Sequence, residues 1–121
     1  MKTLLLLGAI ALSINVFGQS SVKIGNLEVM TEDLGDMEWG EGVKACANLG
    51  DGWRLPTKDE LNILYENKDE IGGFFDNAYW SSTNDEKYSE TAWLQFFNDG
   101  KQVDVFYSES LTCHVRAVRA F

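Results

Sequence analysis

The sequence predicts an α+β domain, and three observations support that fold class. Two segments in the first half, near 43–49 and 57–68, place apolar residues at helical spacing. From residue 78 onward, short apolar runs alternate with polar residues and are separated by turn residues, which is typical of antiparallel strands. One cysteine, Cys46, lies in the first helical segment and the other, Cys113, in the last predicted strand. We therefore expect two helices packed on an antiparallel β-sheet.

Residues 1–18 have the features of a secretory signal peptide rather than of the folded domain. Lys2 supplies a positive charge ahead of an uncharged apolar run over 4–16, and Gly18 offers a small residue at the cleavage position. The run is too short to cross a bilayer, and no cysteine follows it to accept a lipid anchor. A buried N-terminal helix is the alternative. We expect one domain over 19–121 that is secreted or periplasmic and does not insert into a membrane.

The first part of this domain combines a strand region with a helix. Loose alternation over 22–30 surrounds Gly25-Asn26, a hairpin-turn dipeptide, which indicates a short strand pair or a bent strand. The first helix is expected to begin at Asp36, a suitable N-cap, and to end before Gly50.

A capping box begins the second helix, because Thr57 and Glu60 can each accept a hydrogen bond from the other residue's backbone N–H. The Gly72-Gly73 pair is expected to end this helix, since glycine is common just past a helix C-terminus.

Four short strands are expected in the second half, over 79–83, 91–97, 101–107 and 113–119. The turn 98–100, with the sequence Asn-Asp-Gly, is a strong hairpin signal between the middle two. Leu94 and Phe96 share one face of their strand, and Val103 and Val105 share one face of the returning strand. The apolar residues of the last strand do not alternate strictly, which indicates a bulge.

Acidic charge excludes one group of partners. The net charge is −9, and removing residues 1–18, with their single lysine, makes it −10. Such a surface repels nucleic acid, anionic lipid head groups and sulfated polysaccharides. We expect no retention of the exported protein on heparin or immobilised DNA at physiological salt. Retention there would contradict this expectation and would indicate a local basic patch at Arg116 and Arg119.

Five short strings of residues stand out in the domain: Gly52-Trp53-Arg54-Leu55-Pro56-Thr57, Glu60-Leu61, Tyr79-Trp80-Ser81-Ser82-Thr83, Ala92-Trp93 and Val115-Arg116-Ala117-Val118-Arg119. They resemble the Lcl-type C-terminal domain of bacterial surface proteins. The opening of the domain is similar to that of the Fibrobacter major paralogous domain, in the strings Val22-Lys23-Ile24-Gly25 and Met30-Thr31-Glu32-Asp33-Leu34. Together these strings cover nearly all of 19–121.

The resemblance implies a C-type-lectin-like fold and a role as an adhesin or an extracellular binding module. It also implies a core disulfide from the first helix to the last strand, which here would join Cys46 to Cys113. The cysteine count favours a bridge as well, since an even pair in an oxidising compartment is more often bonded than free. Two free buried thiols are the alternative.

The sequence offers little support for catalysis or metal binding. Calcium-dependent lectins use a Glu-Pro-Asn loop, but the only proline here is Pro56, and the segment 97–99 followed by Gly100 is better explained as a turn. Formylglycine-generating enzymes share the broader fold but rely on a pair of redox-active cysteines. The two cysteines here are those of the expected core bridge and the sequence has no third, so this activity is not expected. The segment 81–83 has no nucleophile elbow and no partner base. We expect no enzyme activity, no metal and no cofactor.

Most of the conspicuous side chains have structural explanations. The tryptophans are expected in the core rather than as sugar-stacking platforms: Trp39, Trp53, Trp80 and Trp93. The arginines are expected to pair with carboxylates: Arg54, Arg116 and Arg119. His114, without other metal-ligating residues nearby in sequence, is expected to face solvent.

Polar loops of the second half are the best candidates for a binding surface. We expect Asn84, Asp85, Tyr88 and Glu109 to be exposed and to border one face, with Tyr88 supplying an amphipathic ring. Plain solvated loops are the alternative. The first functional hypothesis is a secreted, non-catalytic module that recognises a glycan or an extracellular protein. The second is a structural or assembly component of the cell envelope that has no small-molecule ligand.

Overall fold

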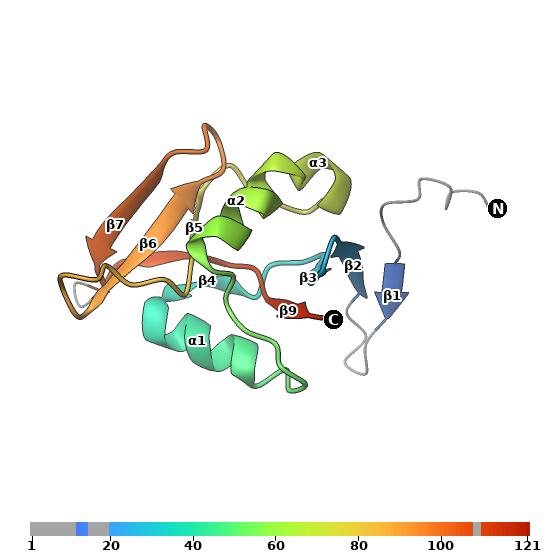
Figure 1. Ribbon diagram of the computed structural model, residues 1–121, viewed down its shortest axis with the longest axis horizontal. Coiled ribbons are helices and arrows are strands. Elements are labelled where there is room, and N and C mark those ends of the chain that lie inside the picture. Colours follow the sequence, from blue (N-terminus) through green and yellow to red (C-terminus); the bar gives the residue numbers. More distant parts are fainter. Residues whose placement is uncertain (1–11, 15–19, 108–109) are drawn as a thin grey trace.

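Two sheets and three helices make up the part of the chain described by the computed structural model, which covers residues 12–14, 20–107 and 110–121. The helix α1 lies on one side of the strands, and α2 and α3 lie on the other (Figure 1). The elements are β1 (Leu12–Ile14), β2 (Ser20–Ile24), β3 (Leu27–Met30), β4 (Gly35–Glu38), α1 (Trp39–Ala47), α2 (Lys58–Glu66), α3 (Lys68–Ile71), β5 (Ala78–Trp80), β6 (Thr91–Phe96), β7 (Gln102–Phe106), β8 (Thr112–Val115) and β9 (Val118–Ala120). The α+β class is confirmed.

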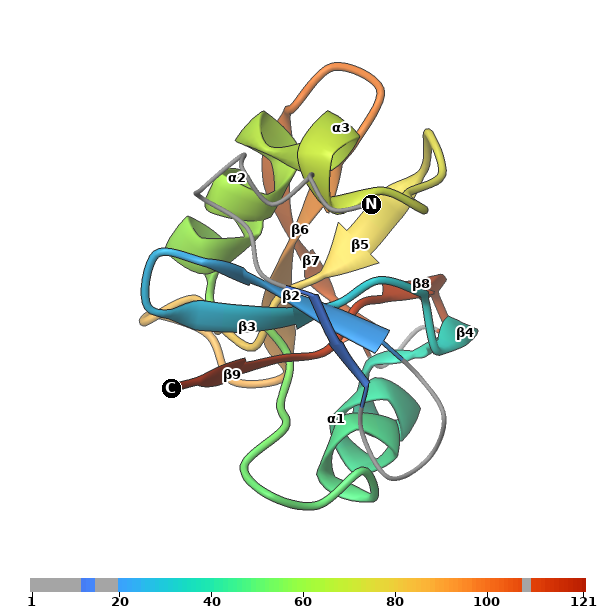
Figure 2. The same ribbon diagram turned by 90° about the vertical axis from the view of Figure 1, so that its right-hand side faces the viewer.

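The strands form two sheets instead of the single antiparallel sheet expected. The four-stranded sheet has the order β1-β2-β3-β9, and the five-stranded sheet has the order β4-β8-β5-β6-β7. Neighbouring strands are antiparallel except β5 and β8, which run parallel. Figure 2 shows the four-stranded sheet facing the viewer, with α1 below it and α2 and α3 above.

The first strand region is a hairpin, which decides between the two expected arrangements. Ile24 pairs with Leu27 directly across the turn, and Gly25 has the positive φ of +58° that such a tight turn requires. The predicted signal-peptide residues lie largely outside the described residues, apart from β1, which pairs with β2.

The first helix begins later than the sequence indicated. Asp36 is not its N-cap, because the chain there is still extended in β4 and pairs with His114 of β8. Glu38 is the N-cap, and its backbone N–H donates a hydrogen bond to the Glu41 carboxylate at 3.0 Å. Gly42 lets the helix approach β8, since a Cβ atom there would lie 3.0 Å from Cγ2 of Val115.

The second helix confirms its predicted start. The Thr57 hydroxyl accepts from the Glu60 backbone N–H at 3.1 Å, and the Glu60 carboxylate accepts from the Thr57 N–H at 2.9 Å. A break at Asn67 separates α2 from the single turn of α3, which ends at Gly72 as expected. The 91–97 and 101–107 hairpin is also confirmed, as β6 and β7.

The expected bulge in the last strand is a complete break. The segment 113–119 divides at Arg116 and Ala117 into β8 and β9, which belong to different sheets. The reason is pairing on both sides of the break: Val115 accepts from the Leu34 N–H, and Ala117 from the Met30 N–H.

The predicted disulfide is not formed in the structure, and both cysteines are free thiols. Cys46 on α1 and Cys113 on β8 lie in the same buried apolar cluster, together with Trp80 and Val115. Burial raises the pKa of each thiol to about 12. Both sulfurs are therefore protonated at neutral pH, and neither is an activated thiolate.

None of the helices in the described part of the chain has the length and apolar character needed to cross a membrane.

Candidate functional site

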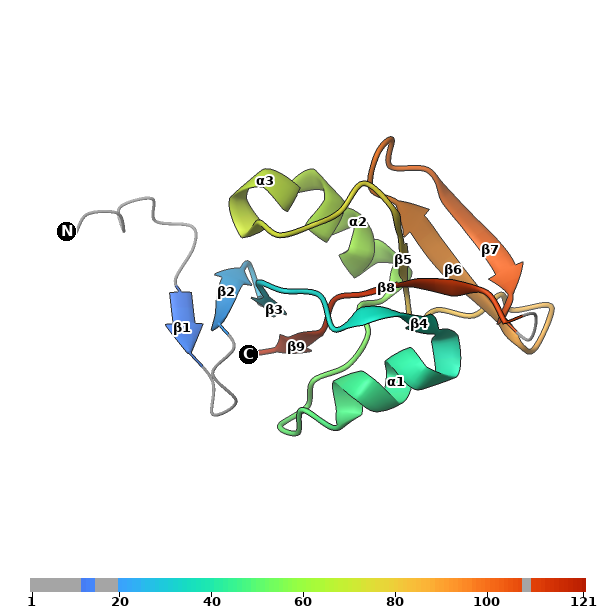
Figure 3. The ribbon, with the colours of Figure 1, turned by 180° about the vertical axis from the view of Figure 1, so that it is seen from behind.

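A groove of about 460 Å³ opens on the five-stranded sheet beside the start of β8. Figure 3 shows this side of the molecule, with β4 and β8 next to α1 and with β6 and β7 beyond them. The groove has mainly aliphatic walls with a few polar groups. Its lining residues are Asp36, Asn77, Ala78, Leu94, Phe96, Val103, Val105, Leu111, Thr112, Cys113 and His114.

The register of the hairpin builds the floor of the groove. Leu94 pairs with Val103, and Phe96 pairs with Ala78 of β5. Because side chains alternate along a strand, Leu94, Phe96, Val103 and Val105 all point to the same face of the sheet. The alternation read from the sequence was therefore correct, and it describes the floor of a groove as well as a core face.

Two large apolar side chains of the groove are partly exposed to water. Phe96 and Leu111 are each 37 % exposed. Covering such apolar surface is favourable, at roughly 25 cal/mol per Å² removed from water. The groove is therefore suited to apolar groups of a ligand.

Polar groups border one end of the groove. The carboxylate of Asp36 is exposed and accepts a long hydrogen bond of 3.5 Å from the Thr112 hydroxyl. The side-chain amide nitrogen of Asn77 lies 3.4 Å from Nε2 of His114. These groups can orient a ligand by hydrogen bonding, and Asp36 gives this border a negative charge.

His114 does not face solvent as the sequence suggested, and its side chain is only 17 % exposed. Its Nδ1 atom lies 3.0 Å from the carboxylate of Asp33. Its ring contacts those of Phe75 and Tyr79, with centroids 5.1 and 5.3 Å away. The residues near His114 in the sequence do not indicate this contact with a carboxylate, because Asp33 lies 81 positions away.

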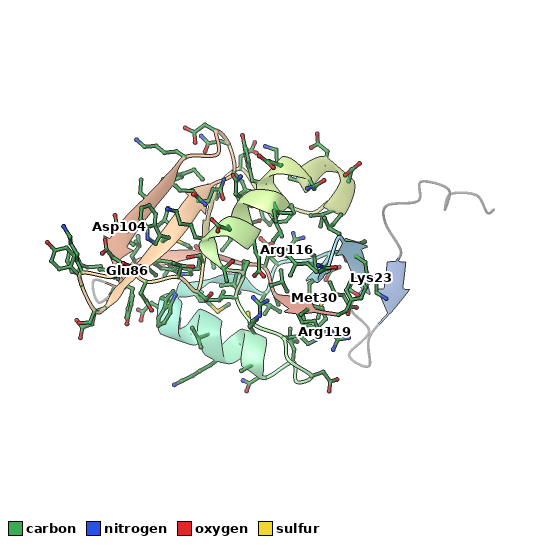
Figure 4. All side chains as sticks on the ribbon, in the orientation of Figure 1. Lys23, Met30, Glu86, Asp104, Arg116 and Arg119 are labelled. Carbon is green, nitrogen blue, oxygen red and sulfur yellow. The ribbon has the colours of Figure 1, made fainter. Side chains whose placement is uncertain are left out.

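A buried ion pair lies behind His114 and supports it. Arg116 is fully buried, its Nε donates to Asp33 at 2.9 Å, and its Nη2 lies 2.8 Å from the same oxygen. Its Nη1 donates to the carbonyls of Met30 and Gly72, at 2.9 and 3.0 Å. Figure 4 shows Arg116 in the interior, between α2 and β9. The guanidinium thus connects three separate segments of the chain.

Tyr79 completes this polar cluster. Its hydroxyl donates to Asp33 at 2.7 Å and accepts from the Phe75 N–H at 2.9 Å. Burial, followed by the hydrogen bond to Asp33, raises the pKa of Tyr79. The hydroxyl is therefore a structural donor, which stays protonated at physiological pH.

The predicted loop residues are only partly brought together. Asn84 is exposed, but its amide donates to the Thr91 carbonyl, and Asp85 is half-buried and accepts from the Lys87 N–H at 2.7 Å. Tyr88 is 55 % exposed. Glu109 lies outside the described residues. Asn84 and Asp85 therefore help to hold the loop, and Tyr88 is the freest of the three predicted contact residues that the structure describes.

The loop lies against the end of β7. The Tyr88 ring meets Phe106 edge-on, with centroids 6.0 Å apart. The carboxyl groups of Asp85 and Asp104 lie close to each other, and the interaction with Asp85 raises the pKa of Asp104. The pKa of Asp85 is lowered, first by the hydrogen bond from the Lys87 backbone N–H and then by the interaction with Asp104.

The tryptophan prediction is confirmed for two residues. Trp53 and Trp80 are buried, at 5 % and 0 % exposed. Trp39 and Trp93 are half-buried: Trp39 stacks on Tyr107 with ring centroids 4.4 Å apart.

The arginine prediction is confirmed for all three residues. The pairs are Arg54–Glu60 at 2.7 Å, Arg116–Asp33 at 2.8 Å and Arg119–Glu28 at 2.9 Å. In the described residues, no three histidine, cysteine or acidic side chains come together as a metal site would require.

Comparison with known protein families gives one match. A family model described as the Lcl C-terminal domain matches residues 20–119. No curated protein matches the chain. The match covers the hairpin at the start of the domain, the groove and the Arg116 cluster.

Proposed function

The chain belongs to the Lcl C-terminal domain family, and from this premise we propose that it is a non-catalytic binding module which acts outside the cytoplasm. The observation that carries the proposal is the groove on the five-stranded sheet, an open apolar site with a polar border. Sites for ligands are commonly concave and largely apolar, with a few polar groups that fix orientation. The proposed ligand is a glycan or the surface of an extracellular protein.

The contacts of His114 support a role without catalysis. Its two nitrogens face Asp33 and Asn77, and its ring lies beside Phe75 and Tyr79. A histidine that activates a side-chain nucleophile needs a serine, threonine or cysteine side chain within hydrogen-bond reach. The described contacts of His114 include no such group, which supports a structural role for the His–Asp pair.

Export is the second part of the proposal. Cleavage after Gly18 would remove β1 together with the apolar run over 4–16 and would leave β2 as an edge strand. In the oxidising compartment beyond the membrane, Cys46 and Cys113 would become the core disulfide. Their presence in one buried cluster supports that pairing, as does the packing of α1 on β8. We assign the C-type-lectin-like fold on the same grounds.

The experiment for binding uses the protein purified after export, screened against arrays of glycans and extracellular protein fragments. Phe96→Glu places a charge in the floor of the groove and is expected to weaken binding of any ligand found by at least about tenfold, since burying an unpaired charge is costly. Val43→Glu is the matched control, because Val43 is 38 % exposed on α1. It should leave the affinity unchanged.

Equal affinity of the two variants would contradict a groove site. A loss of affinity in Tyr88→Ala instead would place the site on the 84–90 loop.

A further inference from the structure

The outer edge of β7 is open for pairing with another strand. β7 is the last strand of its sheet, and its only strand neighbour among the described residues is β6. Phe96 and Lys101 are joined by a backbone hydrogen bond across the hairpin, so by alternation Val103 and Val105 bond to β6. Gln102, Asp104 and Phe106 therefore direct their backbone N–H and C=O groups outward.

The same alternation places two kinds of side chain along this edge. Val103 and Val105 point into the groove. Asp104 is exposed on the opposite face of the sheet, between these two valines in sequence. Side chains of a strand added at this edge would alternate in the same way. Its apolar side chains would lie next to Val103 and Val105 on the groove side, and the residue between them would lie next to Asp104 on the other face.

Negative charge is concentrated at Asp104. The carboxyl group of Asp85 lies close enough to that of Asp104 to raise its pKa, and Glu86 follows Asp85 in the chain. Lys58 and Lys87 face this pair and offset part of the charge. The contact between the two carboxyl groups remains, and the whole chain carries −9. A cation beside Asp104 would relieve the repulsion of the pair.

We propose that β7 accepts an extended segment of a partner protein in which apolar and basic residues alternate. The apolar side chains enter the groove, a lysine or arginine lies beside Asp104, and the outward backbone groups of β7 hydrogen-bond to the segment. The inference rests on the proposed function and specifies its ligand. A second copy of this chain is disfavoured as occupant, because β7 pairing with β7 would bring acidic side chains together.

The test uses isotopically labelled protein purified after export and short blocked peptides followed by NMR. The first peptide alternates valine and lysine, the second alternates valine and glutamate, and the third has the composition of the first with its valines contiguous. Only the first peptide is expected to shift the amide signals of Gln102, Asp104 and Phe106.

Three variants sharpen the test. Asp104→Lys should lower the affinity for the valine–lysine peptide by about tenfold and should allow the valine–glutamate peptide to bind. Phe106→Pro removes one outward N–H but no bond to β6, and it should weaken binding similarly. Glu32→Lys, an equal change of charge at an exposed position between β3 and β4, should change the affinity less than about twofold.

Signal shifts away from β7 and the groove, or equal binding of all three peptides, would overturn the inference. Self-association through β7 would also overturn it. If the arrays give a ligand that Phe96→Glu abolishes while no peptide binds, the strand-addition inference fails and the binding function stands. If neither arrays nor peptides give a ligand, both fail.

Discussion

Replacing Arg116 by methionine is expected to lower the free energy of unfolding by about 3–5 kcal/mol, measured by urea denaturation at neutral pH. Methionine keeps much of the length and apolar contact of arginine but leaves the Asp33 carboxylate without its guanidinium. Asp33 is only 7 % exposed at its side chain, so water cannot replace the lost partner. The carbonyls of Met30 and Gly72 lose a donor as well.

Arg54→Met provides the comparison, because it breaks an ion pair whose arginine side chain is 40 % exposed. Solvent screens that pair, and the expected loss is about 1 kcal/mol or less. The double variant Asp33→Asn with Arg116→Met should lose less stability than the sum of the single variants, since both act on one interaction. Similar losses of unfolding free energy in Arg116→Met and Arg54→Met would show that the buried ion pair contributes no more to stability than the exposed one.

Oxidation of Cys46 and Cys113 to a disulfide is expected to raise the free energy of unfolding by about 4 kcal/mol. The bridge would close a long loop and restrict the unfolded chain, an effect that grows with the logarithm of loop length. Protein purified after export should show no free thiol in denaturant, and protein made in the cytoplasm should show two. The comparison is made by urea denaturation with and without reductant.

A matched control is the Cys46→Ala, Cys113→Ala double variant, in which reductant should have no effect on stability. In the reduced wild type the thiols should react slowly with alkylating agents at neutral pH, because their pKa of about 12 keeps them protonated. Two free thiols in the exported protein would show that the cysteines are core residues only.

Local sequence signals predicted the elements whose cause is local. The Thr57–Glu60 capping box, the turn at 98–100 and the Gly25-Asn26 turn each depend on residues a few positions apart, and each was placed correctly. The prediction of Asp36 as the N-cap of the first helix was wrong because strand pairing competes with the N-cap preference of aspartate. The partner of Asp36 in β8 is far away in the sequence, so local signals do not indicate this pairing. Tertiary contacts of this kind override local propensity.

The candidate site shows the same division. The alternation of Leu94, Phe96, Val103 and Val105 was read correctly, but a pattern of apolar residues does not show which part of a face stays uncovered. Polar character in a loop predicts a binding surface, yet Asn84 and Asp85 use their polar groups to hold the loop itself. The environment of His114 depends on Asp33, which no local pattern connects to it.

The pairing of the last strands with the first has a consequence for when the protein can fold. Val118 of β9 pairs with Val29 of β3, and His114 of β8 pairs with Asp36 of β4. Contacts between residues so distant in sequence form slowly, because a long loop must close first. Neither sheet can be completed until β8 and β9, over 112–120, have been synthesised. Under the export proposed above, this delay would let the unfolded polypeptide pass through a narrow translocation channel and fold on the other side.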